Sequence, residues 1–176
     1  MFFSKASING VYILEPEFHN DNRGFFARTW CKNEVENIGL NSKIVQSSIS
    51  YNYKKGTIRG LHYQRSPYEE VKIVSCIQGA IWDVIIDLRK NSLTFGKWIS
   101  VELSSENYRM VYIPTGFAHG FQTLKDKTKV FYQISEFYHP EVAQGIRWND
   151  PLFKINWPMA CTEISKKDMS YRNFKG

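Results

Sequence analysis

The chain has 176 residues, enough for one domain with a full hydrophobic core, and its charged and apolar fractions are ordinary for a globular protein. The formal net charge of +6 comes from scattered lysines and arginines, so no basic run indicates a nucleic-acid-binding tail. No apolar stretch approaches membrane-spanning length, and we expect neither a nucleic-acid partner nor a membrane anchor.

The cysteines point to a reducing compartment. Cys31, Cys76 and Cys161 are far apart, odd in number and form no C-x-x-C pair, so the sequence predicts neither a disulfide framework nor a zinc knuckle. The first residues also lack the basic segment and long apolar stretch of a secretory signal. We therefore expect a cytoplasmic protein with a single domain over 1–176.

The first predicted elements are short. Residues 11–14 have the pattern of a strand that ends before Pro16, and 18–23 form a polar, turn-rich segment. Residues 32–40 are the clear helix candidate of the first half, and they end at Gly39, a common C-cap residue.

Two arginines flank an aromatic pair in residues 23–28. One interpretation is a solvated loop that leads into a strand. The other is a ligand contact, in which Arg23 and Arg28 face an anion and Phe26 supplies a stacking plane. The residues alone favour the loop.

A strand predicted over 44–51 carries Gln46, Ser48 and Ser50 on one face. Such a polar face suits either the lining of a barrel or a surface exposed to water. The sequence does not choose between these two interpretations.

The most informative stretch is 59–64, with the sequence RGLHYQ. Its residues favour an extended backbone, so alternate side chains point to opposite faces. We expect His62 to share a face with Gly60 and Gln64. Arg59 would lie on the other face, unless Gly60 marks a bulge. An imidazole on the inner face of a barrel is a candidate general base.

The second half continues the short-strand pattern, with Gly and Pro between strands. Lys72 lies inside an apolar run, where it would be either exposed or buried beside an anion. Ser165 begins an N-capped turn near the end. This spacing predicts an all-β fold, a cupin-type jelly-roll barrel with a few short helices. The further strands are predicted over 71–77, 80–88, 98–103, 108–113 and 129–137.

The motif Pro114-x-Gly116-x-x-His119 resembles the second cupin signature. Metal-binding cupins use His-x-His, a later Glu and the histidine of this signature, but here the first element is His62-x-Gln64. Because zinc and non-haem iron sites favour imidazole ligands, we expect no metal and no cofactor. A metal-dependent cupin isomerase or dioxygenase is an alternative, with Glu69 or Glu70 as the carboxylate.

Several motifs together resemble the dTDP-4-dehydrorhamnose 3,5-epimerase family of nucleotide-sugar epimerases, over residues 10–168. The motifs that carry the resemblance are Arg23-Gly24-x-Phe26, Gly56-x-x-Arg59-Gly60-Leu61-His62-Tyr63-Gln64, Lys72, Gly79-Ala80-x-x-Asp83-Val84, Asp87-Leu88-Arg89, Ser92-x-x-Phe95-Gly96, Pro114-x-Gly116-Phe117-Ala118-His119-Gly120-Phe121, Trp148-x-Asp150-Pro151 and Ser165-x-x-Asp168.

The resemblance implies a role for each matching residue. His62 matches the base, Asp168 the carboxylate that orients it, Tyr132 the acid on the opposite face of the sugar, and Lys72 a residue beside the developing enolate. It also implies a cofactor-independent homodimer that exchanges an N-terminal strand. The implied substrate contacts are Arg23, Phe26, Arg28, Gln46, Ser48, Arg59, His119, Tyr138 and Lys167.

The implied substrate is an NDP-4-keto-6-deoxyhexose, inverted at C3, C5 or both in deoxysugar synthesis for a surface polysaccharide such as O-antigen. The chain departs from the family pattern at Arg28, Ser48 and Ala143, where Glu, Asn and Glu are common. A guanidinium only donates hydrogen bonds, so Arg28 suggests a reduced preference for thymidine and a CDP-linked substrate as an alternative. A non-catalytic sugar-nucleotide binding module is the remaining alternative.

Overall fold

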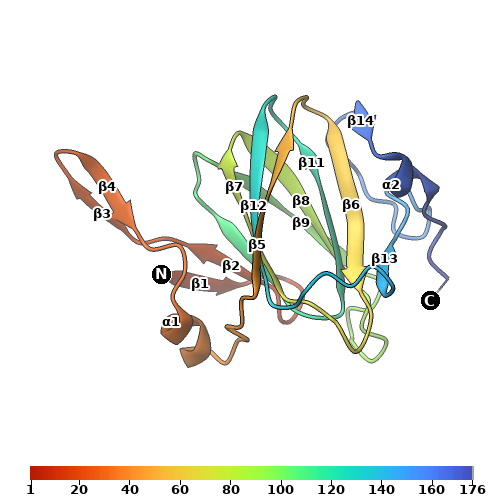
Figure 1. Ribbon diagram of the computed structural model, residues 1–176, viewed down its shortest axis with the longest axis horizontal. Coiled ribbons are helices and arrows are strands. Elements are labelled where there is room, and N and C mark those ends of the chain that lie inside the picture. The colour runs from red at the N-terminus through yellow and green to blue at the C-terminus, as the bar shows by residue number, and fades with distance from the viewer. Residues whose placement is uncertain (176) are drawn as a thin grey trace.

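The structure is a computed structural model that describes residues 1–175, and it confirms the all-β prediction. Two sheets face each other in a cupin-type jelly roll (Figure 1). The first sheet has the strand order β1 (Phe2–Lys5), β2 (Tyr12–Glu15), β10 (Met110–Ile113), β7 (Lys72–Gln78), β12 (Thr128–Ile134), β5 (Gln46–Asn52). The second has the order β13 (Ala143–Gly145), β6 (Thr57–Gln64), β11 (Phe117–Thr123), β8 (Ala80–Asp87), β9 (Trp98–Ser104).

Three smaller elements complete the fold. The short strand β14 (Glu163–Ile164) pairs in parallel with β6, and α2 (Lys166–Ser170) follows it directly. Helix α1 (Lys32–Asn37) is shorter than predicted, since the chain leaves the helix before Gly39, which has a positive φ of 76°. Neither helix of residues 1–175 is long enough to cross a membrane.

The apolar core fills one end of the space between the sheets and leaves the other end open. Strand β8 is buried on both faces, which explains its nearly continuous apolar sequence. Ile81 and Ile85 pack between the two sheets, whereas Val84 and Ile86 pack beneath the segment that includes Phe153. The second sheet is therefore held on both sides, so the strands that carry polar side chains into the cavity have a rigid support.

A bulge in β6 brings two predicted site residues onto the same face. His62 pairs with His119, but Arg59 pairs with Phe121, so three steps on β6 match two on β11. The extra residue lies at Gly60, whose φ is +126°. Arg59 and His62 consequently both line the cavity, which is the outcome expected if Gly60 marks a bulge.

Residues 18–23 were expected to be turn-rich, and the structure has a turn at Asn22 and Arg23 but a strand before it, which was not predicted. Strands β3 (Phe18–Asp21) and β4 (Gly24–Ala27) form a hairpin with a two-residue connection. Phe18 and Phe25 pack edge to face on Tyr108, with ring centroids 5.4 and 5.2 Å from it. The contact with Tyr108 stabilises the hairpin, although the polar sequence of the hairpin gives no sign that β3 and β4 pair. The hairpin projects away from the two sheets (Figure 1).

We predict that Gly60→Ala destabilises the protein more than Gly96→Ala. Both glycines have positive φ, which costs an alanine on the order of 1–3 kcal/mol. A Cβ at Gly60 would also lie 2.6 Å from the Gly120 Cα, whereas one at Gly96 would have no neighbour within 4 Å. The collision adds about 1–3 kcal/mol. Urea unfolding measures the difference, and equal losses in the two variants would contradict the close strand contact.

Candidate active site

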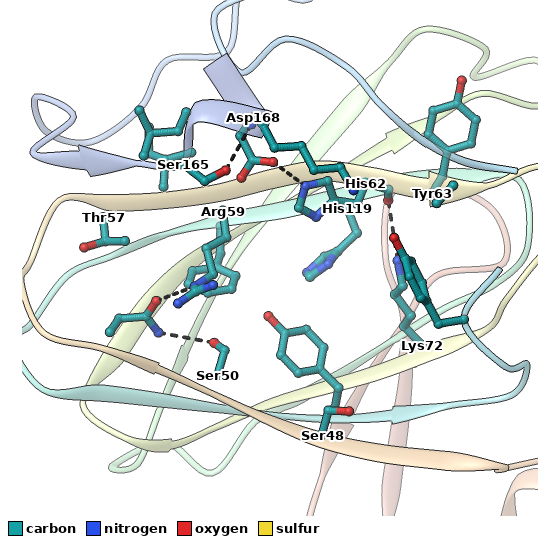
Figure 2. Close-up of a pocket in the computed structure, with 18 of the residues that line it drawn as sticks. Ser48, Ser50, Thr57, Arg59, His62, Tyr63, Lys72, His119, Ser165 and Asp168 are labelled. Atoms are coloured by element: carbon teal, nitrogen blue, oxygen red, sulfur yellow. Dashed lines mark hydrogen bonds and ion pairs between the residues drawn. The ribbon is translucent and has the colours of Figure 1, made fainter. Parts of the chain in front are cut away.

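A cavity of about 960 Å³ opens between the two sheets at the end that the apolar core leaves free. Strands β5, β7 and β12 line it from the first sheet, and β6 and β11 line it from the second. The segment around β14 and α2 closes one side. Figure 2 shows His62 and His119 inside the cavity, with Asp168 beside His62 and Ser48 on the facing strand.

The sequence-predicted residues fall into two groups. Ten of them line this cavity: Gln46, Ser48, Arg59, His62, Lys72, His119, Tyr132, Tyr138, Lys167 and Asp168. The other three, Arg23, Phe26 and Arg28, lie on or next to the β3–β4 hairpin and do not line the cavity of their own chain. Phe26 is 71% exposed, and the Arg28 Nη1 atom donates to Glu34 Oε1 at 2.8 Å.

His62 is held by a buried carboxylate. Its Nε2 atom lies 2.7 Å from Asp168 Oδ1, and Asp168 Oδ2 accepts a hydrogen bond from the Gly60 N–H at 3.3 Å. The Asp168 N–H in turn donates to the side chain of Ser165, the predicted N-cap of α2, at 3.0 Å. Ser165 therefore holds the backbone of Asp168 in place, and the side chain of Asp168 in turn holds the His62 imidazole.

Asp168 is ionised at neutral pH. Burial alone would raise the pKa of its carboxyl, but the hydrogen bond and charge of His62, with the Gly60 and Ser165 contacts, lower it below its usual range. An ionised carboxylate only accepts hydrogen bonds, so Nε2 of His62 must carry the hydrogen. In the neutral imidazole the lone pair is then on Nδ1, and this nitrogen is free to accept a proton.

A second histidine–carboxylate pair lies deeper in the cavity. His119 Nε2 is 2.7 Å from Asp83 Oδ2, and the side chains of both residues are almost completely buried. Burial raises the pKa of Asp83, an effect that His119 partly offsets. The rings of His119 and Tyr132 meet edge to face at 6.2 Å. Burial, together with the charge of Asp83, raises the pKa of Tyr132 well above its usual range, so Tyr132 holds its proton firmly.

Lys72 is buried with an anionic partner, the second of the two interpretations that its apolar context allowed. Its ammonium lies 2.7 Å from Glu70 Oε1, and the two side chains are only 12% and 10% exposed. The same ammonium lies 3.5 Å from the backbone carbonyl of His62. A cation is thus fixed beside the candidate base, where negative charge on a substrate oxygen would be stabilised.

Polar residues at one end of the cavity form a connected set. The Arg59 Nε atom donates to Asn52 Oδ1 at 2.7 Å, and Asn52 Nδ2 donates to Ser50 Oγ at 3.3 Å. Gln46, Ser48 and Ser50 alternate along β5 and all line the cavity, so the barrel-lining interpretation of this strand is confirmed. Amide, hydroxyl and guanidinium groups are suited to the oxygens of a phosphate or sugar.

Several lining residues were not predicted as site residues from the sequence, among them Asn52, Glu70 and Tyr171. Asn52 lies on the inner face of β5 beyond Ser50, so the period-2 pattern could have identified it. Glu70 was considered as a metal ligand, but its partner is Lys72. Tyr171 lies past the end of α2, and nothing in its local sequence distinguishes it.

The described residues contain no group of three or more His, Cys, Asp or Glu placed to hold a metal ion. Gln64 takes the place of the second cupin histidine, and its side-chain amide forms hydrogen bonds with the backbone. Its Nε2 atom donates to the carbonyls of Tyr68 and Phe137 at 2.8 and 3.0 Å, and its Oε1 atom accepts from the His139 N–H at 2.6 Å. Gln64 therefore ties two loops together beside the cavity.

The fold and the cavity define a cupin-type protein equipped for proton transfer. The family model described as dTDP-4-dehydrorhamnose 3,5-epimerase matches residues 5–176. A dTDP-4-dehydrorhamnose 3,5-epimerase from Methanothermobacter thermautotrophicus is 44% identical over 173 residues, which cover 97% of this chain and 92% of the relative. The chain belongs to the dTDP-4-dehydrorhamnose 3,5-epimerase family.

Solved structures agree with this assignment. A dTDP-4-dehydrorhamnose 3,5-epimerase from Bacillus anthracis with TDP and PPi bound superposes with a TM-score of 0.95 at 39% identity, covering 98% of this chain and 99% of that one. A dTDP-6-deoxy-D-glucose-3,5-epimerase from Legionella pneumophila in complex with dTDP-4-keto-L-rhamnose gives 0.92 at 37% identity, covering 98% and 92%. The sequence-based family assignment is therefore confirmed.

We predict that Asp168 makes the stability of the fold depend on pH in the acid range. Its pKa is lowered on folding, so below the unfolded value of about 3.9 the unfolded state binds more protons than the folded state. The Asp168 contribution is therefore complete above that value and is lost as the pH falls through the lowered folded pKa.

The test is urea unfolding of wild type and Asp168→Asn between about pH 6 and pH 3. The stability difference between the two proteins should shrink as the pH falls. A difference that stays constant over this range would show that Asp168 does not exchange its proton on folding as described.

Proposed function

We propose that this nucleotide-sugar 3,5-epimerase binds a dTDP-linked 4-keto-6-deoxyhexose in the cavity and inverts C3 and C5 by removing and returning protons. The observation that carries the proposal is the His62–Asp168 hydrogen bond of 2.7 Å inside a cavity that Tyr132 lines from the other sheet. A base and an acid on facing walls match the requirement of inversion, which takes a proton from one face of a carbon and returns one to the other.

The first step is proton abstraction. The C4 ketone acidifies the C–H bonds at C3 and C5. Nδ1 of His62 accepts the proton, the C–H electron pair forms a C=C bond to C4, and the π pair of the C4 carbonyl moves onto the ketone oxygen. Asp168 stabilises the resulting imidazolium through Nε2–H. The enolate oxygen carries the negative charge, and Lys72 supplies the cation that stabilises it.

The second step returns a proton to the opposite face. Tyr132 donates its phenolic proton to the carbon of the enolate, and the electron pair returns to re-form the C4 ketone. Exchange with water then removes the proton from the His62 imidazolium and returns one to the Tyr132 phenolate, which resets both groups. A phenol whose pKa is raised by burial releases its proton only to a strongly basic carbon, so the proton stays in place until the enolate forms. The pair of His119 and Asp83 borders the same space.

We propose dTDP as the nucleotide. The proteins from Bacillus anthracis and Legionella pneumophila are named as bound to TDP and to dTDP-4-keto-L-rhamnose, which supports this choice. The alternative of a CDP-linked substrate depends on Arg28 reaching the nucleobase, and Arg28 is ion-paired with Glu34 in its own chain. Arg59, Gln46 and Lys167 are the proposed contacts to the substrate within the cavity, with Ser48 and Tyr138.

We also propose that the protein is a homodimer in which the β3–β4 hairpin completes the cavity of the partner. Arg23 and Phe26, which by resemblance contact substrate, stand exposed on a projecting hairpin and away from their own cavity. Placing them against a second copy would reconcile their expected role with their position. The cytoplasmic location, the single domain over 1–176 and a role in O-antigen synthesis stay predictions.

We predict that His62→Asn abolishes solvent exchange. With dTDP-4-dehydrorhamnose in deuterated water, wild type should introduce deuterium at C3 and C5, and His62→Asn should do so about 10²- to 10⁴-fold more slowly. The matched control is His139→Asn, since His139 stacks on Tyr68 outside the cavity lining. Label introduced by His62→Asn at the rate of wild type would remove His62 from the reaction.

The dimer proposal predicts recovery of activity from two defective variants. Arg23→Ala should lack the hairpin contact and His62→Asn should lack the base. A mixed dimer has one complete cavity, because the Arg23→Ala protomer keeps its base and receives Arg23 from its partner. Co-expression should restore about a quarter of wild-type activity for a random mixture. No recovery, with dimers formed, would contradict a contact between protomers.

A further inference from the structure

Tyr171 makes an unassigned contact with the proposed base. It follows α2 directly and lines the cavity. Its ring meets the His62 imidazole edge to face, with the centroids 6.0 Å apart and the planes at 70°. This geometry is one of the favoured arrangements of aromatic pairs. His62 is therefore contacted twice from the same C-terminal segment, by Asp168 through a hydrogen bond and by Tyr171 through its ring.

The backbone provides a fitted surface for the Tyr171 ring. Gly145 on β13 pairs directly with His62 on β6. An ideal Cβ built on Gly145 would overlap the Tyr171 ring, at atoms Cε2, Cζ and Cδ2. The ring thus lies flush against the glycine, and any side chain at position 145 would displace it. Gly145, Tyr171 and His62 form a close-packed group at the cavity wall.

We propose that Tyr171 is a positioning residue of the epimerase, whose ring fixes the orientation of the His62 imidazole. The proposal rests on the proposed function. A single hydrogen bond from Nε2–H to Asp168 fixes one nitrogen but leaves the ring free to swing about that point. The Tyr171 ring blocks this movement and keeps Nδ1 directed at the substrate carbon, where a misplacement of about 1 Å costs about 10²-fold in rate.

Two substitutions test the ring contact. Tyr171→Phe keeps the ring on His62 and loses only the hydroxyl, so kcat and KM for deuterium exchange should both stay within about twofold of wild type. Tyr171→Leu loses the aromatic contact, so kcat should fall about tenfold or more. The matched control is Met169→Ala, an exposed position on α2 that should leave both parameters unchanged.

A third substitution tests the packing against Gly145. Gly145→Ala should lower kcat in the presence of Tyr171, because its methyl group displaces the ring. In a Tyr171→Ala background the same methyl group has room, so Gly145→Ala should cause little further loss. Losses that simply multiply would contradict the proposal, as would wild-type kcat in Tyr171→Leu.

A measurement without substrate separates this inference from the proposed function. The ¹H–¹⁵N signal of the His62 ring should be sharp in wild type and Tyr171→Phe, and broadened in Tyr171→Leu, where the ring swings away from Asp168. An identical signal in all three proteins would overturn the positioning role. Absence of exchange by wild type would contradict the proposed function alone, because the ring signal does not depend on turnover.

Discussion

The hydrogen bond between His62 and Asp168 is the constraint on which the site depends. It joins residues 106 positions apart, one on a strand of the second sheet and one on the last helix. The Ser165 cap fixes the backbone at Asp168, and the bulge at Gly60 turns His62 and Arg59 to the same side. Without the C-terminal segment folded back along β6, the imidazole would have no carboxylate partner.

The composition of the strands decides which end of the space between the sheets is filled by the apolar core and which end forms the cavity. Apolar residues such as Ile85 and Phe121 close one end, and the polar inner face of β5 leaves the other end open. Strand β8 has apolar residues on both faces and is buried from both sides. The proposed base His62 and the proposed acid Tyr132 are therefore carried by strands of two sheets that pack on a common apolar core.

Local patterns sufficed to predict most of the longer strands, the jelly roll and the cap at Ser165, because periodicity and turn residues are read over a few positions. Most of the cavity residues were instead named through the family resemblance. They did not reveal the pairing of β3 with β4, since its polar sequence resembles a turn and its support comes from Tyr108. Contacts between distant residues were also beyond local reading, because a contact such as that of Tyr171 with Gly145 depends on the assembled fold. The family resemblance supplied the roles, and the structure supplies the contacts that support them.

In the proposed reaction, a base on one wall of the cavity removes a proton from the sugar and an acid on the opposite wall returns one. The most direct measurement follows deuterium exchange and inversion together in Tyr132→Phe. His62 still forms the enolate in this variant and can return a proton to the same face, so exchange should persist while inversion falls steeply. An equal loss of exchange and inversion would contradict the assignment of Tyr132 as the acid on the opposite face.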